Sequence, residues 1–352
     1  MEIFRGTTAD DVWRQAYQAV MATAASDNLQ PSRAGEAFEL LHVAFEIDDP
    51  RQRWVTSRHP AINPAFGIAE VVWILAGSND AGPLNYWFPR LPEFAGEGPT
   101  YAGAYGYRLR RQFGVDQVQR ACDVLASNPA SRQVVLQLWD VRADLPQNDG
   151  TPRCPDIPCN VASLLKVRAG RLEWMQILRS NDLHRGLPYN FLQFTVLQEI
   201  MAGWLGLGVG RYHQWSDSLH VYVDAASQFS CAPETRLAMN TDSLAIDVNR
   251  GEALVGELYQ RMVDLAKPEV SESQLAELAL IRGAPEGYQN LLRVLGAESA
   301  RRRARHDQAT EVMAGCTNPQ LIQAWSAWSV RTQRMGSGSR TETSPNGQSR
   351  GG

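Results

Sequence analysis

Two neighbouring stretches that alternate apolar and polar residues set the strongest constraint on the fold. Residues 160–168, NVASLLKVR, and residues 171–180, RLEWMQILRS, show the period of two that is typical of strands with one buried face. Only Ala169 and Gly170 separate them, and a short connection that contains glycine favours a tight turn. We therefore predict a β-hairpin that places residues near 160 opposite residues near 179.

Helical and extended segments alternate around this hairpin. Helices are expected at residues 9–26, 64–77, 115–127 and 188–206, and from about residue 250 onward. Strands are expected at residues 36–47, 132–140 and 218–223, and long loops at residues 77–106 and 142–158. This order predicts an α+β fold, a three-layer α/β arrangement with a mixed, mostly antiparallel sheet and flanking helices. We expect one domain over residues 1–335 and a disordered Gly/Ser-rich tail over residues 336–352.

Charge and cysteine content exclude several classes of protein. With 34 basic and 38 acidic residues, the chain has a net charge of −4 and no electrostatic reason to coat a nucleic acid polymer. The cysteines have unrelated spacings, which predicts reduced thiols and no metal site; they are Cys122, Cys154, Cys159, Cys231 and Cys316. No signal peptide or membrane-length apolar run is visible, so we expect a cytoplasmic protein without a membrane partner.

The sharpest local motif is DIPCN at residues 156–160, where a proline-rich loop enters the first strand of the predicted hairpin. A cysteine nucleophile reacts as its thiolate, which a nearby positive charge stabilises. The hairpin register would bring Arg179 and Ser180 beside Cys159. On spacing alone, an inert cysteine beside a structural arginine remains the simpler interpretation.

Three further polar clusters have both a functional and a structural interpretation. The first two clusters are RSND (179–182) and GLPYN (186–190), in which the arginine and serine suit a phosphate and Asn190 suits the edge of a pyrimidine. The structural interpretation is that Asp182 or Asn190 caps a helix. In SLHVY (218–222), His220 and Tyr222 point to one face of a strand and suit a sugar hydroxyl, although core packing would look similar. Glu70, inside an apolar helix, is unfavourable to bury unless it is paired or functional.

In combination these motifs resemble those of thymidylate synthases and the related pyrimidine-nucleotide hydroxymethylases. EVVWILAGSND (70–80), PCN (158–160), RSND, GLPYN and LHVY (219–222) occur in the family's order, from about residue 60 to residue 225. Each motif is weak alone, but the set is specific. The resemblance implies an α/β homodimer joined through its sheets and the one-carbon donor 5,10-methylenetetrahydrofolate, with no metal.

The resemblance assigns roles to individual residues. Cys159 matches the nucleophile that adds to C6 of the pyrimidine, Glu70 matches the acid that orders water, and Tyr105 matches the tyrosine after the family's long loop. Arg179 also stands near the nucleophile, so the expected catalytic set is Cys159, Glu70, Arg179 and Tyr105. The expected nucleotide ligands are Arg33, Arg132, Arg179, Ser180, Asn190, His220 and Tyr222, of which Arg132 would reach the phosphate of the neighbouring subunit. Asp182 and Gly186 are the expected folate contacts.

The product depends on what reaches the exocyclic methylene that forms at C5. Hydride from the folate gives a methyl group, whereas water gives hydroxymethyl. The indole-bearing element of the synthases is replaced by residues 90–94, and their short apolar C-terminus is missing, so water has more access. These departures favour hydroxymethylation. Methylation remains the alternative if Trp87, Phe88 or Phe94 replaces the indole, or if Trp325 or Trp328 closes the site, since either would restore the behaviour of a synthase.

Asn190 favours uracil over cytosine, because a neutral amide can accept from N3–H and donate to O4. Gln133 replaces a family arginine, which leaves deoxyribose and ribose both open. We thus expect a homodimeric one-carbon transferase that hydroxymethylates dUMP or UMP. The alternatives are a thymidylate synthase that makes dTMP and dihydrofolate, a (d)CMP 5-hydroxymethylase, and an inactive nucleotide-binding scaffold.

Overall fold

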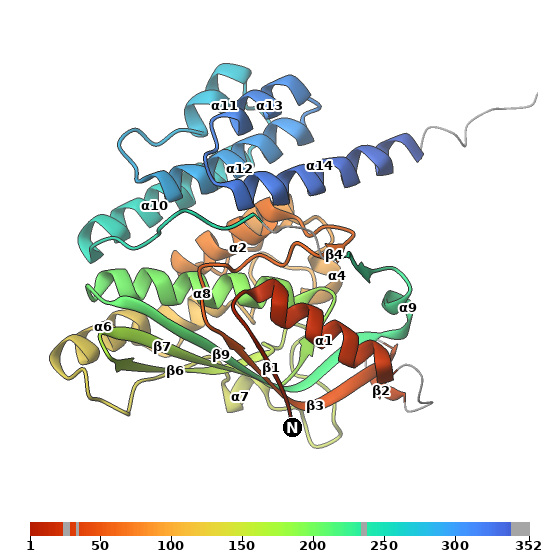
Figure 1. The fold of residues 1–352 in the computed structure, drawn as a ribbon, viewed down its shortest axis with the longest axis vertical. Coiled ribbons are helices and arrows are strands. Elements are labelled where there is room, and N and C mark those ends of the chain that lie inside the picture. Colours follow the sequence, from red (N-terminus) through yellow and green to blue (C-terminus); the bar gives the residue numbers. More distant parts are fainter. Residues whose placement is uncertain (24–28, 33–34, 234–237, 339–352) are drawn as a thin grey trace, which may run out of the picture.

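One mixed sheet organises the chain in a computed structural model that describes residues 1–23, 29–32, 35–233 and 238–338 (Figure 1). Its strand order is β1-β3-β9-β7-β6-β5, with β2 beside β3 and β8 beside β9. The strands are β1 (Glu2–Gly6), β2 (Gln30–Ser32), β3 (Gly35–Ile47), β5 (Val135–Gln137), β6 (Asn160–Arg168), β7 (Arg171–Leu178), β8 (Asn181–Asp182) and β9 (Gly208–Tyr222). A separate two-stranded sheet pairs β4 (Arg58–His59) with β10 (Ser230–Cys231).

The predicted hairpin is confirmed. β6 and β7 pair antiparallel with Asn160 opposite Leu178, and Ala169 and Gly170 form the turn with φ of 48° and 72°. Positive φ at both central residues is the turn geometry that matches the twist of paired strands. The sheet is mixed, as predicted, because β1 on β3, β7 on β9 and β8 on β9 are parallel pairs.

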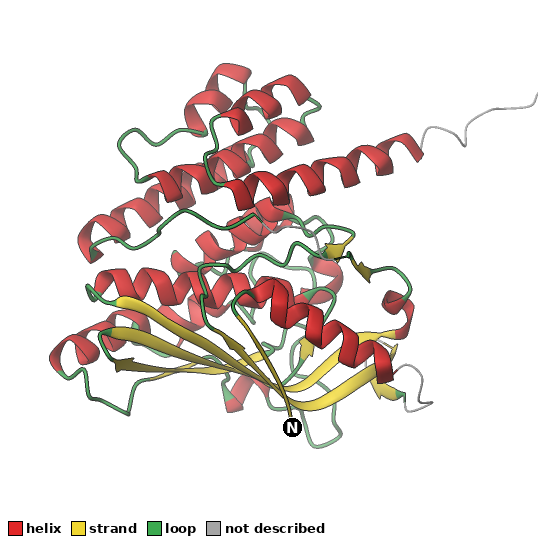
Figure 2. Cartoon of the chain, in the orientation of Figure 1, coloured by secondary structure: helices red, strands yellow, loops and turns green. Residues whose placement is uncertain are grey.

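Helices cover one face of the sheet and build a second layer above it (Figures 1 and 2). The covering helices include α1 (Ala9–Thr23), α2 (Pro64–Leu75) and α8 (Gly186–Trp204). Beyond α2 lie α10 (Val248–Leu265), α11 (Glu272–Leu278), α12 (Glu286–Arg302), α13 (His306–Ala314) and α14 (Pro319–Gly338). Because α2 packs between the two helical layers, every one of its residues except Glu70 is buried.

Short helices occupy the segments that connect the larger elements. They are α3 (Ala81–Trp87), α4 (Pro92–Ala95), α5 (Tyr105–Tyr107), the π-helix η1 (Arg108–Gln112), α6 (Gln117–Ser127), α7 (Val141–Asp144) and α9 (Val223–Ala226). The expectation of plain loops over residues 77–106 and 142–158 was therefore wrong in part. None of the helices in the described ranges has the length and apolar character of a membrane span.

Two further boundaries differ from the prediction. The strand expected at residues 218–223 is the end of β9, which begins at Gly208, and the strand expected at residues 132–140 shortens to Val135–Gln137. One side of β9 is buried and the other is half-buried. Because both sides carry polar residues, the sequence of β9 does not show the apolar–polar alternation that marks a strand, and its first part was not predicted. The half-buried side belongs to the open face of the sheet, where Leu164, Met175, Ile177 and Trp215 lie in register on neighbouring strands.

Candidate active site

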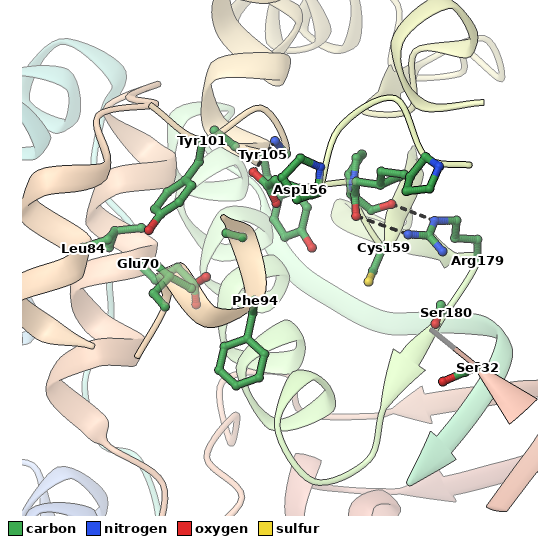
Figure 3. Close-up of a pocket in the computed structure, with 18 of the residues that line it drawn as sticks. Ser32, Glu70, Leu84, Phe94, Tyr101, Tyr105, Asp156, Cys159, Arg179 and Ser180 are labelled. Carbon is green, nitrogen blue, oxygen red and sulfur yellow. Dashed lines mark hydrogen bonds between the residues drawn. The ribbon is translucent and has the colours of Figure 1, made fainter. Parts of the chain in front are cut away.

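A cavity of about 570 Å³ opens beside the β6–β7 hairpin. Its walls come from α2, the α3–α4 segment, residues 101–105, the loop at residues 150–159 and the end of β7. Six of the predicted site residues line it: Glu70, Tyr105, Cys159, Arg179, Ser180 and Tyr222. Residues far apart in the sequence therefore meet in one cavity (Figure 3).

Cys159 and Arg179 lie side by side at the mouth of the hairpin, as the register predicts. The Arg179 backbone N–H donates to the Cys159 carbonyl at 2.9 Å. Its Nε donates to the Pro158 carbonyl at 3.0 Å and its Nη2 to the Ile157 carbonyl at 3.2 Å, while its guanidinium lies 5.4 Å from the centre of the Trp139 ring. A cation held this firmly beside a thiol favours negative charge on the sulfur.

Glu70 faces Cys159 from the other side of the cavity (Figure 3). Its Oε2 accepts a hydrogen bond from Gln193 Nε2 at 2.6 Å. Burial raises the pKa of the Glu70 carboxyl to about 7, because its surroundings disfavour the charged form. A carboxyl group in this state can both donate and accept a proton near neutral pH.

Tyr105 lies between these two groups. An alanine Cβ at Gly106 would lie 2.1 Å from the Ile74 carbonyl oxygen, so only glycine lets this segment press against α2. Burial raises the pKa of the Tyr105 hydroxyl well above its usual value, and the nearby Cys159 and Glu70 raise it further. Tyr105 therefore stays protonated and acts as a hydrogen-bond donor.

The wall that carries Tyr105 is fixed by a buried ion pair. Arg108 donates to both oxygens of Asp144, at 2.5 and 2.9 Å, and its Nε donates to the Ala102 carbonyl at 2.8 Å. Both charged side chains are almost fully buried. This pair joins the segment before Tyr105 to α7, and the sequence motifs gave no indication of it.

Two expected sugar ligands lie together at the end of β9. The His220 and Tyr222 rings meet edge to face with centroids 5.2 Å apart, which confirms that they share one side of the strand. Tyr222 lines the cavity with Ser180, whereas His220 is not among the lining residues. Burial raises the pKa of the Tyr222 hydroxyl, and Ser32 donates or accepts a side-chain hydrogen bond there.

The expected base and folate ligands lie next to the cavity but do not line it. Asn190 is buried in α8, where its Nδ2 donates to Asn181 Oδ1 at 3.1 Å, and Gly186 adjoins the same pair. Asp182 Oδ1 accepts from the backbone N–H groups of His184 and Arg185 at 2.7 and 2.9 Å. Asp182 thus stabilises the turn that precedes α8, but it does not cap the helix, which begins at Gly186 with no side-chain cap, so the helix-capping alternative was wrong for Asp182.

The two remaining arginine ligands expected from the resemblance are Arg33 and Arg132. Arg132 is exposed on the loop after α6 and is not among the cavity-lining residues, whereas Arg33 lies outside the described residues. Arg132 therefore has no contact with the site of its own subunit in the described part of the chain.

Only one of the aromatic residues proposed to replace the synthase indole, Phe94, is among the residues that line the cavity. Phe94 lines the cavity and stacks on Phe88 at 6.2 Å, but Trp87 is fully buried outside it. Trp328 donates to Glu298 at 3.1 Å and, like Trp325, is not a lining residue. Trp73, one turn beyond Glu70 on α2, does line the cavity with its indole. The sequence analysis did not identify Trp73 as a site residue, although its i, i+3 spacing from Glu70 places both side chains on one face of the helix.

Among the described residues, no group of three His, Cys, Asp or Glu side chains could hold a metal ion. The cavity is lined by thiol, carboxyl, phenol and guanidinium groups, those of Cys159, Glu70, Tyr105 and Arg179 among them.

Comparison with known proteins agrees with this geometry. The family model described as thymidylate synthase matches residues 18–266. The deoxyuridylate hydroxymethyltransferase of Bacillus phage SP01 is 35% identical over 223 residues, which is 60% of this chain and 57% of that protein. The protein of the same name from Pseudomonas phage M6 is 34% identical over 180 residues, which is 51% of this chain and 49% of that protein. The one from Delftia phage PhiW-14 is 30% identical over 190 residues, which is 52% of each chain. The chain spans about half the length of the curated relatives it matches.

Proposed function

Because this chain belongs to the thymidylate synthase family, we propose that it transfers a one-carbon unit to C5 of a uracil nucleotide and leaves it as hydroxymethyl. The observation that carries the proposal is the cavity in which Cys159 and Arg179 face Glu70, with Tyr105 between them. The name shared by the three relatives favours dUMP as the nucleotide and water as the final nucleophile.

Cys159 begins the reaction by adding its thiolate to C6 of the uracil ring. The new S–C6 bond pushes electrons toward O4 and makes C5 nucleophilic, and Arg179 keeps a positive charge beside the reacting sulfur. The co-substrate 5,10-methylenetetrahydrofolate supplies the one-carbon unit that C5 takes up. Glu70, with its pKa near 7, suits the proton transfers at the ring, while Tyr105 donates a hydrogen bond.

The last steps release the product. A base first removes the C5 proton and tetrahydrofolate departs, which leaves an exocyclic methylene at C5. Water then adds to the methylene, its proton passes to a base, and the S–C6 bond breaks so that the C5–C6 double bond and the Cys159 thiolate are restored. The open cavity supports this outcome, because Trp325 and Trp328 lie elsewhere and Phe94 is 39% exposed at its edge.

The nucleotide can be oriented by groups around Cys159. Arg179 makes its hydrogen bonds to the described residues through N–H, Nε and Nη2, which leaves Nη1 for a phosphate beside Ser180. Tyr222 and His220 would meet the sugar hydroxyl. Arg33 and Arg132 complete the proposed phosphate ligands, the latter across a subunit interface.

The preference for uracil has a structural argument. Asn181 Nδ2 donates to Ser216 Oγ at 3.1 Å, so Asn181 presents its oxygen to Asn190. Asn190 must then use Nδ2 toward Asn181, which leaves its own oxygen as an acceptor. Uracil has a hydrogen on N3 to meet that oxygen, whereas neutral cytosine has none.

The cofactor and the assembly are also part of the proposal. Asp182 and Gly186, at the start of α8, would contact the folate. A homodimer would cover the apolar residues on the open face of the sheet: Leu164, Met175, Ile177 and Trp215. The same dimer would bring Arg132 toward the partner's cavity.

Product analysis tests the proposal. The protein is incubated with 5,10-methylenetetrahydrofolate and dUMP, UMP or dCMP, followed by mass spectrometry of the nucleotide and absorbance of the folate. A uracil nucleotide heavier by CH₂O, with tetrahydrofolate as the second product, supports it. A gain of CH₂ with dihydrofolate, a preference for dCMP, or nucleotide binding without turnover would each contradict it.

A further inference from the structure

A second carboxyl group lines the cavity, and the steps assigned above leave it unused. Asp156 stands three residues before Cys159, at the end of the proline-rich loop. Its Oδ2 accepts a hydrogen bond from the backbone N–H of Gly103 at 2.6 Å. In Figure 3 the Asp156 side chain lies beside Tyr105, on the Cys159 side of the cavity.

The position of this carboxylate is tightly constrained. An alanine Cβ at Gly103 would lie 2.6 Å from Asp156 Oδ1, so only a glycine allows the carboxylate to lie this close to the opposite wall. That wall also carries Tyr101 and Tyr105, and Arg108 fixes it through the Ala102 carbonyl. Asp156 is thus held in one place by backbone and not by a flexible side chain.

In the described part of the chain, Asp156 has no cationic partner that would neutralise it. Within the described ranges, no lysine, arginine or histidine nitrogen lies within 4.0 Å of its oxygens, and the nearby Arg108 is paired with Asp144. Burial raises the pKa of the Asp156 carboxyl from its ordinary value, while the Gly103 N–H opposes that rise. A buried carboxylate with one hydrogen-bond donor keeps spare acceptor capacity for water.

The two carboxyl groups of the cavity have different surroundings. Glu70, on α2, is held by Gln193 of α8, and Asp156 is held by Gly103 on the facing wall. Paired carboxyls with different environments commonly divide acid and base work between them. Glu70 is already assigned to proton transfers at the ring, and Asp156 is a second carboxyl group in the same cavity that can accept a proton in the later step.

We propose that Asp156 is the catalytic base for the water that completes the hydroxymethyl group, an inference that rests on the proposed function. Water oxygen forms a bond to the exocyclic methylene carbon, and one water proton passes to an Asp156 oxygen. The methylene π electrons move into the ring toward O4, and their return restores the C5–C6 bond as the Cys159 thiolate leaves. Asp156 then returns its proton to solvent, so atoms and charge balance.

The test separates this step from those before it. Asp156→Asn, in molar excess over C5-tritiated dUMP so that each active site turns over at most once, is incubated with the folate, and the rates of tritium release and of hydroxymethyl formation are measured in the same sample. The ratio of the two does not depend on how much protein is folded. We expect tritium release close to that of the unaltered protein and a loss of hydroxymethyl product of about 100-fold, which is the usual contribution of a general base.

A small thiol in the reaction gives a second readout. In Asp156→Asn the methylene should last longer, so the thiol should capture it as a thioether on the exocyclic carbon that is attached to C5. Asp156→Ser is the second variant, since its hydroxyl can still accept from the Gly103 N–H. Asp123→Asn, which makes the same change on the exposed side of α6, is the matched control and should leave the ratio unchanged.

Each outcome decides one question. An unchanged ratio of hydroxymethyl product to tritium in a folded variant, or a parallel loss of both, would overturn the role of Asp156 as the base for water. A gain of CH₂ by dUMP with the unaltered protein would instead overturn the proposed function on which the inference rests.

Discussion

Replacing Glu70 with glutamine should change how the stability of the fold depends on pH. Burial raises the pKa of the Glu70 carboxyl from 4.5 to about 7, and each pKa unit corresponds to about 1.4 kcal/mol. Because the folded-state pKa lies above that of the unfolded chain, the stabilising contribution is complete below pH 4.5 and is lost as the pH rises through about 7. Ionisation of Glu70 should therefore cost at most about 3 kcal/mol of unfolding free energy.

The substitution keeps the size of the side chain and removes its charge. Gln193 Nε2 can still donate to the new amide oxygen, and the buried Gln193 Oε1, which has no partner among the described residues, can accept from the new amide nitrogen. Urea denaturation of both proteins across this pH range gives the difference in unfolding free energy. We expect Glu70→Gln to gain stability relative to the unaltered protein as the pH rises, whereas Glu93→Gln, on the exposed α4, should show no such gain. Two parallel stability curves would refute a Glu70 carboxyl that is half-buried in the cavity and exchanges its proton near neutral pH.

Three other substitutions probe the fold, the assembly and the site. Arg108→Ala should lower the free energy of unfolding by about 3–5 kcal/mol, because it leaves Asp144 charged and buried; a loss in urea denaturation below about 1 kcal/mol would contradict this. Ile177→Asp should convert a dimer into a monomer in analytical ultracentrifugation, and an unchanged sedimentation coefficient would argue against assembly through the open sheet face. Arg179→Lys should lower kcat/KM for the nucleotide by about 100-fold, since lysine cannot bond two loop carbonyls and stack on Trp139 together; near-normal kcat/KM would show that the charge alone suffices.

The parts of the fold that were predictable have strong local patterns. The β6–β7 hairpin alternates over its whole length and carries Ala169 and Gly170 at the turn, so its register and the meeting of Cys159 with Arg179 follow directly. The buried α2 was predictable for the same reason, because its apolar run begins after the capping Asn63 and Pro64. β9 was recognised only at its end, since both of its sides carry polar residues.

The rest depends on contacts between distant segments. The environment of Asp156 is set by Gly103, which lies 53 positions earlier, and no pattern in either segment indicates the other. The helical layer beyond α2 likewise packs through residues that are distant in the sequence; for example, Arg302 Nη2 donates to the Trp87 carbonyl at 2.7 Å. The family resemblance supplied candidate roles for Asn190 and Asp182, but only the structure gives their hydrogen-bond partners.

The central claim is that Cys159 is the nucleophile, and release of tritium from C5-labelled dUMP measures it most directly. The C5 hydrogen is lost only after a thiolate has added to C6, whatever the final product is. We predict folate-dependent release by the unaltered protein, no release by Cys159→Ala, and normal release by Cys154→Ala, which alters a cysteine on the same loop that does not line the cavity. Release by a folded Cys159→Ala protein at the rate of the unaltered protein would contradict the account.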